Sequence, residues 1–355
     1  MEEINLLNSK KFEFDYNKIL SNLESSSIQE RFLLTRQEIQ EFFDDISSQE
    51  SFWLARNPVE KHLEYIHYRI SMRRVKNDYK TLDFPLYLLI EPTSVCNLKC
   101  PMCFQTDQTF TTKKYMGMMD FNLFSEITKE AKSIGVKAIT LASRGEPTLH
   151  PRFTDMISNL RNLDFLDLKI NTNATKLDER KIRSILENEI NEFVLSIDSA
   201  SSTEYEKLRF GAKFEKTLET VKLLKSLTDE YPNRKTLTRI SGVKVHDEQN
   251  WDAFYKFWSP YVDQVGWVDS EMRWDTYNNE IAKIDDPCVY PFERLYIWHD
   301  GVANPCDVDY KSLLSPGKYP EMNLLKLWEN QNSIRLQHQV GDRNTLVPCD
   351  RCGVC

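Results

Sequence analysis

The sequence predicts an α/β fold, a partial barrel of six strand–helix units, and two observations support this prediction. From residue 84 onward, short apolar runs alternate with amphipathic helical runs, a pattern typical of parallel strands joined by right-handed crossovers. Six such units are too few for a closed eight-stranded barrel, so an open barrel is expected. The 355 residues suffice for one large domain and one or two small modules.

The expected strands of the barrel lie between residues 84 and 280. They cover residues 86–90, 137–142, 166–171, 193–197, 237–245 and 263–268. The helices between them are expected at residues 121–134, 151–161, 178–188, 213–227 and 249–258. Because barrels of this kind carry their chemistry at the carboxyl ends of the strands, motifs that directly follow a strand are the candidate site residues.

Residues 1–83 are expected to form a helical N-terminal extension. Thr35 and Glu38 stand at capping-box spacing ahead of apolar residues that recur at helical intervals. A later helix of this extension carries a basic cluster, Arg69, Arg73, Arg74 and Lys76. The cluster is expected to face solvent or to pair with Glu60 and Glu64, and the alternative is an anionic substrate.

Composition and charge narrow the class of protein. A hydrophobic content of 41% argues against disorder, and the net charge of −8 argues against a nucleic-acid partner, which would favour a basic face. The acidic N-terminus shows no signal-peptide pattern, and no apolar run approaches the length of a membrane span. A cytoplasmic protein with no membrane partner is therefore expected.

All eight cysteines lie at or after residue 96, in two groups. The first group is Cys96, Cys100 and Cys103, spaced C-x3-C-x2-C shortly after the first expected strand. Thiolates are strong ligands for iron–sulfur clusters, and three of them leave one iron of a four-iron cluster open for a ligand. A zinc loop is the alternative, although zinc loops mostly pair C-x2-C with another C-x2-C or with histidine.

This spacing, with Met102 and Phe104 on either side of the last cysteine, resembles the radical S-adenosylmethionine (SAM) superfamily. In that family the open iron chelates the amino and carboxylate groups of SAM. An electron then cleaves SAM to methionine and a 5′-deoxyadenosyl radical. The resemblance implies that Cys96, Cys100 and Cys103 hold a catalytic [4Fe–4S] cluster in a barrel spanning residues 84–280.

Later strand ends are similar to the SAM-binding motifs of the same superfamily. Ser143–Pro147 resembles Gly-Gly-Glu-Pro with Arg144 in place of the first glycine, and residues 171–175 resemble Thr-Asn-Gly-Thr with alanine in place of glycine. Residues 196–198 resemble a Ser-x-Asp motif, and an arginine follows where relatives offer one to the SAM carboxylate. The resemblance implies SAM contacts from Gly145, Glu146, Asn173, Ser196 and Arg209. Each motif alone would be an ordinary turn.

Arg239 is a charged residue inside the fifth expected strand. It is expected either to reach into the pocket, where it contacts substrate or SAM, or to face solvent.

The second group of cysteines is Cys288, Cys306, Cys349, Cys352 and Cys355. The first two bracket an expected hairpin with Asp300–Gly301 as its turn, a helix is expected near residues 323–338, and a C-x2-C pair follows. This order resembles the Twitch domain, the short form of the SPASM extension. The resemblance implies an auxiliary [4Fe–4S] cluster held by Cys288, Cys306, Cys349 and Cys352 in a domain spanning residues 281–355, and a four-cysteine zinc site is the alternative.

The resemblance implies a radical SAM oxidoreductase or epimerase that abstracts hydrogen from a small carbohydrate-like substrate, a sugar or an aminocyclitol. The alternatives are a maturase of a ribosomal peptide and a non-catalytic iron–sulfur electron-transfer protein. SAM cleavage implies an electron donor such as flavodoxin or ferredoxin. Cys355 is expected to be an incidental terminal cysteine or an alternative cluster ligand, or the hydrogen donor if the enzyme epimerises.

Overall fold

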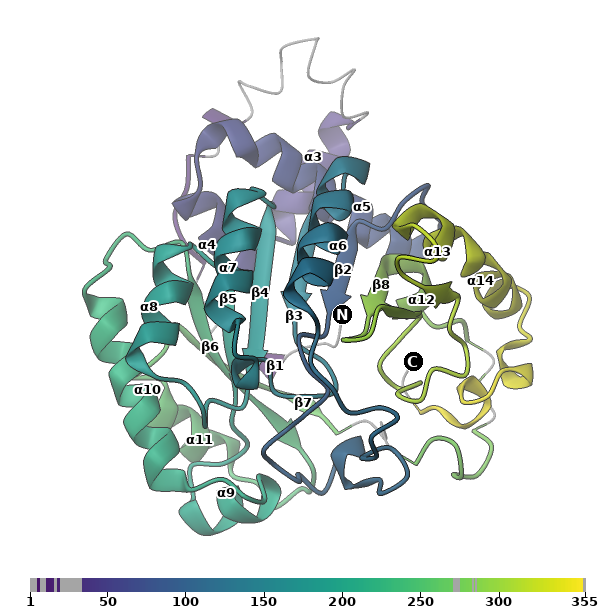
Figure 1. Cartoon of the computed structure of the whole chain (residues 1–355). Helices are drawn as coiled ribbons and strands as arrows, with labels where there is room; N and C mark the ends of the chain where they lie inside the picture. Colours follow the sequence, from purple (N-terminus) through teal and green to yellow (C-terminus); the bar gives the residue numbers. More distant parts are fainter. Residues whose placement is uncertain are drawn as a thin grey trace.

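The computed structural model describes residues 5–6, 11–15, 18–19, 34–270, 275–282, 284 and 286–353, so the expectation for Cys355 lies outside the described residues. The described chain forms a sheet of ten strands in the order β1-β7-β6-β5-β4-β3-β2-β8-β9-β10. Its centre consists of parallel strands that follow one another in the chain (Figure 1). They are β2 (Tyr87–Ile90), β3 (Ala138–Leu141), β4 (Asp167–Thr172), β5 (Glu192–Ser196), β6 (Leu237–Lys244) and β7 (Gln264–Asp269). The edge strands do not pair with each other, so the barrel is open and the predicted fold class is confirmed.

Helices cover the outer face of these strands, as Figure 1 shows. They are α6 (Phe121–Ile134), α7 (Phe153–Asn162), α8 (Glu179–Glu187), α10 (Phe214–Asp229) and α11 (Trp251–Trp258), all close to the expected ranges. α9 (Ser202–Leu208) is an addition that the apolar pattern did not indicate. Side chains of Asp120, Asp178 and Asn250 accept hydrogen bonds from first-turn N–H groups and so fix where α6, α8 and α11 begin.

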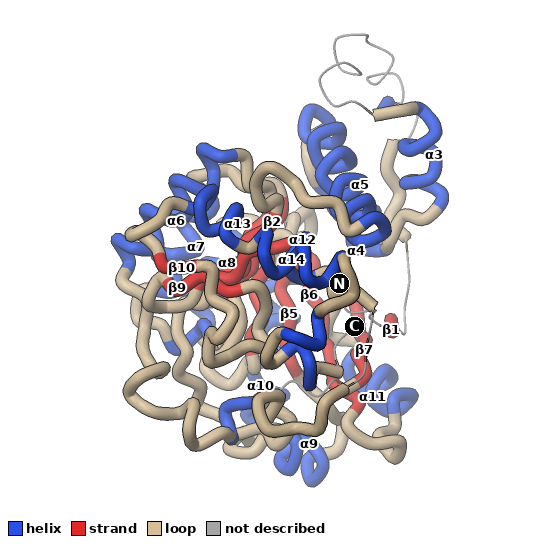
Figure 2. Tube along the Cα trace, turned by 90° about the vertical axis from the view of Figure 1, so that its right-hand side faces the viewer, coloured by secondary structure: helices blue, strands red, loops and turns tan. Residues whose placement is uncertain are grey.

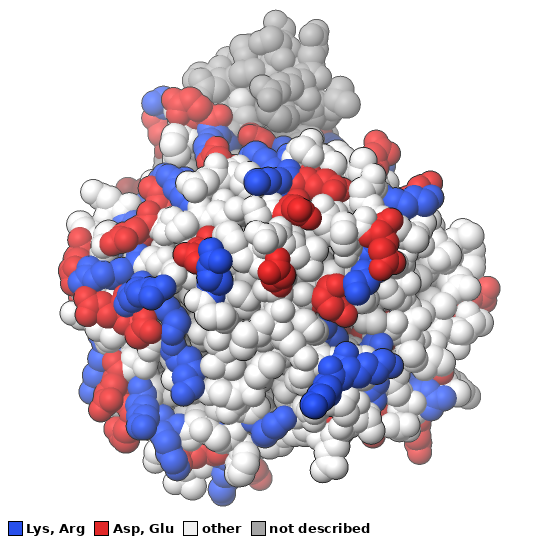
Figure 3. Space-filling model, in the orientation of Figure 1, with Lys and Arg blue, Asp and Glu red and all other residues white. Residues whose placement is uncertain are grey.

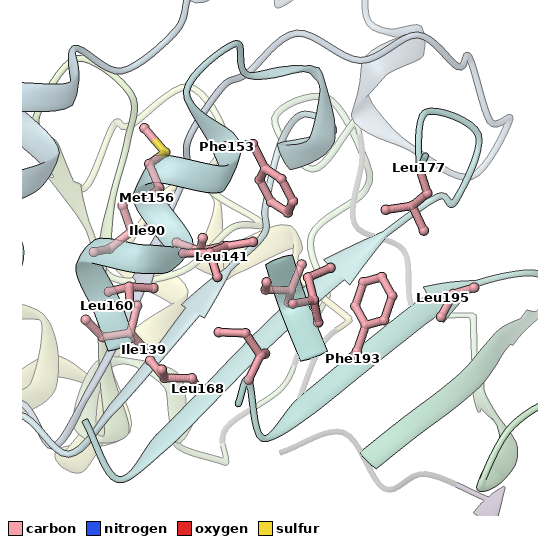
Figure 4. Close-up of a cluster of buried hydrophobic side chains, with 14 of the residues drawn as sticks. Ile90, Ile139, Leu141, Phe153, Met156, Leu160, Leu168, Leu177, Phe193 and Leu195 are labelled. Atoms are coloured by element: carbon pink, nitrogen blue, oxygen red, sulfur yellow. The ribbon is translucent and has the colours of Figure 1, made fainter. Parts of the chain in front are cut away.

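The main hydrophobic core lies between this outer strand face and the helices (Figure 4). Alternate residues of the strands, such as Ile139 and Leu141 in β3, are fully buried there against Met156 and Leu160 of α7. Each such side chain contributes roughly 1.5–3 kcal/mol of burial free energy. Since successive side chains of a strand point to opposite faces, the residues between them face the inside of the barrel.

The N-terminal extension covers the amino ends of the strands (Figures 1 and 2). It contains β1 (Asn5–Leu6), α3 (Arg36–Asp44), α4 (Ser48–Arg56), the 3-10 turn η1 (Val59–Lys61) and α5 (His62–Asp78). The capping box at α3 is present, because Thr35 and Glu38 each accept a hydrogen bond from the other's backbone N–H. Trp53 Nε1 donates to the Leu166 carbonyl at 2.9 Å, which fixes α4 against the start of β4.

The basic cluster of α5 does not find the expected partners. Arg69 Nε lies 2.8 Å from Glu50 Oε1, and Arg73 Nη2 lies 2.9 Å from Glu50 Oε2. Burial alone would raise the pKa of Glu50, but the two guanidinium groups hold it below its usual value. Glu64 instead pairs with Lys137. Spacing along one helix could not reveal these partners, because α4 and the barrel supply them.

The C-terminal region continues the barrel sheet. It comprises α12 (Tyr290–Glu293), β8 (Arg294–Ile297), β9 (Val302–Asn304), β10 (Gly317–Lys318), α13 (Leu324–Asn330), α14 (Asn332–Gln339) and the 3-10 turns η4 (Arg343–Thr345) and η5 (Cys349–Arg351). β8 pairs in parallel with β2, and β9 returns antiparallel after the Asp300–Gly301 turn. The division at residues 280 and 281 therefore stays a proposal about domains within one continuous sheet.

The charged side chains on the face shown in Figure 3 are of both signs and interspersed. Among the described residues, no helix is both long and apolar enough to cross a membrane.

Candidate active site

The inner face of the open barrel bounds a cavity of about 1080 Å³. The loop that follows β2 lines one end of it, and α4 and α5 line the other. The cavity thus runs from the carboxyl ends of the strands to their amino ends. This volume is slightly larger than the range typical of small-molecule sites, roughly 300–1,000 Å³.

The three thiols of the first group line this cavity together. Cys96, Cys100 and Cys103 are free thiols on the loop directly after β2, and the Cys103 N–H donates to the Cys100 carbonyl at 3.0 Å. Burial raises the pKa of Cys96 to about 11 and that of Cys103 to about 12. Without a metal these thiols are therefore protonated, and coordination to a metal would deprotonate them.

Two donors face these sulfurs. Arg209 Nη1 lies 4.0 Å from Cys100 Sγ, and Asn173 Nδ2 lies 3.8 Å from Cys96 Sγ. No three metal-ligating side chains in the described part of the chain converge on one ion. In a cubane cluster each thiolate binds a different iron, and three thiols that line one cavity, with N–H donors beside two of them, fit a [4Fe–4S] cluster.

Gly145 is required by a close approach of two backbones. A Cβ at this position would overlap Thr93 and lie 2.6 Å from the carbonyl oxygen of Val95. The next residue, Glu146, donates its N–H to that same carbonyl at 2.9 Å. The turn after β3 is therefore fixed against the chain that leads into the cysteine loop, which places Gly145 at the cavity wall.

The Glu146 carboxylate connects the ends of β3 and β4. Its Oε1 accepts hydrogen bonds from the Thr172 hydroxyl at 2.6 Å and from Thr148, and its Oε2 accepts one from the Asn173 N–H at 2.7 Å. Burial raises its pKa, and these donors counteract the rise. Each carboxylate oxygen has two lone pairs. Glu146 Oε2 accepts one hydrogen bond from the protein, so it can accept a second one from the SAM amino group, as proposed.

Asn173 lies between Glu146 and the cysteine loop. Its Nδ2 donates to Asn97 Oδ1 at 3.1 Å, and its Oδ1 accepts from the Thr175 hydroxyl at 2.6 Å. Ala174, at the position where the family motif has glycine, has a φ of 66°. Ala174 thus adopts the left-handed backbone conformation that glycine favours.

Arg209 is held by a carboxylate at the end of β5. Its Nε donates to Asp198 Oδ2 at 2.5 Å and its Nη2 to Asp198 Oδ1 at 2.9 Å. Asp198 also accepts the Val243 N–H at 2.9 Å, so β6 fixes the pair. Ser196 lines the cavity two residues before Asp198, opposite Ser241 in the sheet register.

The interior of the barrel is more polar than the sequence analysis predicted. Asp167, Lys169 and Asn171 of β4 and Glu192 of β5 line the cavity. The sequence pattern indicates this polar face, because the polar residues of β4 alternate with Leu168 and Ile170, which pack in the core. For Arg239 the structure decides between the two alternatives: it is 2% exposed, lines the cavity and forms an ion pair with Glu192.

Asp167 provides a test of this polar interior. Burial raises the pKa of Asp167 to about 6, above the ordinary 3.8. The folded protein therefore favours the protonated carboxyl. The stability that this preference provides is complete below about pH 4 and is lost as the pH rises through 6. Asp167→Asn is therefore expected to raise the free energy of unfolding by about 2 kcal/mol at pH 8 and to leave it nearly unchanged at pH 4.

Urea denaturation of both proteins at the two pH values measures this difference. The exposed Asp155→Asn is the matched control, because its side chain is 46% exposed. A loss of stability at pH 8 in Asp167→Asn would contradict the prediction and make Asp167 a stabilising ion-pair partner.

The cysteines of the second group that are described also come together. Cys288 and Cys352 belong to one buried cluster with Tyr290 and Val308, and the partly buried Cys306 packs against it. Burial and the neighbouring Cys352 together raise the pKa of Cys349 to about 12. These four positions therefore have the donor set of an auxiliary [4Fe–4S] cluster.

The thiol loop after the first parallel strand, at the mouth of an open barrel, defines the class of protein. Residues 90–257 match the family model of the radical SAM superfamily, so the chain contains a radical SAM domain. Members of the superfamily use a [4Fe–4S] cluster and SAM. The predicted recognition and the catalytic cofactors are thereby confirmed.

Among curated relatives, one is the tungsten-containing aldehyde ferredoxin oxidoreductase cofactor-modifying protein of Pyrococcus furiosus, 37% identical over 113 residues, which are 32% of this chain and 30% of the relative. Another is the cysteine-type anaerobic sulfatase-maturating enzyme of Clostridium novyi, 30% identical over 187 residues, which are 48% of this chain and 47% of the relative. The chain thus spans less than half the length of these relatives.

Among solved structures, Streptococcus suis SuiB bound to precursor peptide SuiA has the same fold. It aligns with a TM-score of 0.56 at 15% identity and covers 87% of each chain.

Proposed function

We propose that this protein is a radical SAM enzyme that reductively cleaves SAM and abstracts a hydrogen atom from a C–H bond of a small polar molecule. A sugar or an aminocyclitol is the proposed substrate, and oxidation or epimerisation is the proposed outcome. The observation that carries the proposal is that three thiols and a polar strand face line the same cavity. When bound there, the cluster supplies an open iron for SAM and the electron that cleaves it.

The residues of this chain would hold and orient the cofactors. Cys96, Cys100 and Cys103 are the proposed ligands of the catalytic cluster. Arg209, fixed by Asp198, supplies a positive charge beside the thiols and is proposed to pair with the SAM carboxylate. The remaining proposed SAM contacts are Gly145, Glu146, Asn173 and Ser196.

The C-terminal region is proposed to be a Twitch-like domain, residues 281–355, with an auxiliary [4Fe–4S] cluster on Cys288, Cys306, Cys349 and Cys352. The burial of these thiols together supports it. We further propose that flavodoxin or ferredoxin supplies the electron and that the protein acts in the cytoplasm.

The first expected result is an iron count of about eight per chain, the sum of two four-iron clusters. Anaerobic reconstitution with iron and sulfide, followed by metal analysis, measures it. The same preparation is expected to form 5′-deoxyadenosine from SAM under reducing conditions. About four irons with one zinc would contradict the auxiliary cluster and leave the catalytic one in place.

A maturase of a ribosomal peptide is the second candidate, since the relative from Clostridium novyi is a sulfatase-maturating enzyme. Binding of a peptide instead of a small molecule would favour it. A reconstituted protein that never cleaves SAM would instead favour a non-catalytic electron-transfer protein.

A further inference from the structure

The middle of the barrel cavity contains a charged group of side chains that the SAM contacts do not use. Lys169 of β4, Glu192 of β5 and Arg239 of β6 lie on adjacent strands and line the cavity. Glu192 Oε2 lies 3.5 Å from Lys169 Nζ, and its Oε1 pairs with Arg239 Nη1. One carboxylate shared by two cations leaves this trio with an excess positive charge.

The surrounding groups do not cancel that excess. Toward α4 and α5, the cavity wall also carries Arg69 and Arg73 with Glu50, and Asp167. With Lys11, Lys76, Asp44 and Asp45, which line the same end of the cavity, six cations face five carboxylates between the extension and Arg239. Burial alone would raise the pKa of Glu192, but Arg239 and Lys169 hold it below its usual value, so the shared carboxylate stays ionised.

Three buried polar atoms here have no hydrogen-bond partner among the described residues, and one of them, Glu192 Oε1, is the atom that forms the ion pair with Arg239. Arg239 is 2% exposed, and its Nε has no hydrogen-bond acceptor. Asn171 Oδ1 is likewise buried without a donor. In the sheet register both residues stand opposite Val194, one from each neighbouring strand, so they belong to the same level of the cavity. Because the two ends of a side-chain amide are interchangeable by rotation, Asn171 can also present its NH₂ to a ligand.

This level lies deeper than the cysteine loop. Val243 of β6 lies at the level of the loop. Its N–H donates to Asp198, and Asp198 holds Arg209 beside Cys100. Arg239 precedes Val243 by four residues of β6, about 13 Å at the rise of a strand. An anion held by Arg209 at the thiols is therefore a different group from one held by Arg239.

We infer that Arg239, with Lys169 and Asn171, forms a subsite for an acidic group of the substrate, a carboxylate or a phosphate. The inference rests on the proposed function, which assigns this cavity to the substrate, and it narrows the substrate to a small polar molecule that carries a negative charge. A guanidinium pairs with either anion through two N–H groups, and the Nε of Arg239 offers one that no residue of the described chain accepts.

Anion binding to the reconstituted, SAM-saturated full-length protein tests the inference. SAM is kept in excess so that its own carboxylate site is filled. The probes are inorganic phosphate and D-gluconate, with D-glucose as the neutral match of gluconate, and titration calorimetry gives the affinities. Phosphate or gluconate is expected to bind more tightly than glucose, and which of the two binds better distinguishes a phosphorylated from a carboxylated substrate.

Arg239→Gln is expected to weaken binding of the preferred anion by roughly tenfold or more, and Arg239→Lys by less. The SAM affinity of Arg239→Gln is expected to stay within about twofold of the wild type. A tenfold loss of SAM affinity would mean that the variant has lost a charged contact with SAM. Arg234→Gln is the matched control: Arg234 lies just before β6 and pairs with Asp263 at 2.6 Å, but it does not line the cavity. If Arg239→Gln fails to fold, Lys169→Gln serves as the second variant with the same expected loss.

Three results would overturn the subsite: no preference of the wild type for either anion over glucose, equal anion affinity in the wild type and Arg239→Gln, or weakened SAM binding with unchanged anion binding. The last result would assign Arg239 to SAM. Failure of the proposed function is a separate observation. A wild-type protein that binds the anion but never forms 5′-deoxyadenosine would support the subsite and contradict the proposed enzymatic activity.

Discussion

Cys100→Ala is expected to reduce the formation of 5′-deoxyadenosine from SAM to background while leaving the fold intact. Cys100 is 7% exposed and lines the cavity between the other two thiols of its loop. Without its thiolate, only two local ligands remain for the cluster that must reduce SAM. The fold should persist, because the change removes one sulfur from a wall whose backbone is held elsewhere, by Lys99 N–H to the Phe210 carbonyl at 2.9 Å.

Liquid chromatography of the reaction under dithionite measures the loss, and circular dichroism checks the fold. Cys349→Ala is the matched control, because it removes the same atoms from the other thiol group. Both variants should lose about four irons, but only Cys100→Ala should lose SAM cleavage. Continued 5′-deoxyadenosine formation by a folded Cys100→Ala protein would remove Cys100 from the catalytic ligands.

The strands, the cysteine loop and the motif positions could be predicted because each is a local pattern. Short apolar runs bounded by turn residues gave β2 to β7 to within one or two residues. The cysteine spacing needs no tertiary knowledge, since the three thiols sit on one loop. The Thr35–Glu38 capping box is local in the same way.

The partners of buried charges could not be predicted, since they come from elements far apart in the sequence. Arg69 and Arg73 meet Glu50 only because α4 packs beside α5. The polar barrel interior is a different case. Asp167, Lys169 and Asn171 alternate with apolar residues, and a parallel strand buried on both faces would be apolar throughout. That alternation indicates a polar lumen and was readable from the sequence.

Arg144 shows why a departure from a family motif needs the structure. It stands in place of the first glycine of the motif, and its side chain is 2% exposed. Its Nε lies 2.6 Å from Glu91 Oε2 and its Nη2 lies 2.7 Å from Glu91 Oε1. Its Nη1 donates to the Tyr310 carbonyl at 2.8 Å, and its guanidinium lies 4.1 Å from the Trp298 ring centroid. The residue thus joins the turn of Gly145 and Glu146 to the C-terminal region.

Arg144→Met is expected to destabilise the protein by about 3–5 kcal/mol at pH 7, because it leaves the fully buried Glu91 carboxylate without its main partner. Burial alone would raise the pKa of Glu91, but Arg144 and His299 lower it to about 2. With a folded pKa below the ordinary 4.5, the stabilisation is present above pH 4.5 and is lost as the pH falls toward 2. The difference between Arg144→Met and wild type should therefore shrink in acid.

Urea denaturation from pH 7 down to pH 3 measures this difference. Arg161→Met is the matched control, since Arg161 is 41% exposed and its pair with Glu189 should contribute at most about 1 kcal/mol. The double variant Glu91→Gln/Arg144→Met should recover part of the lost stability, because it removes the unpaired charge. If Arg144→Met is no less stable than Arg161→Met at pH 7, the pair does not hold the two regions together. The arginine in the motif would then lack a structural reason, and direct contact with bound SAM would have to supply one.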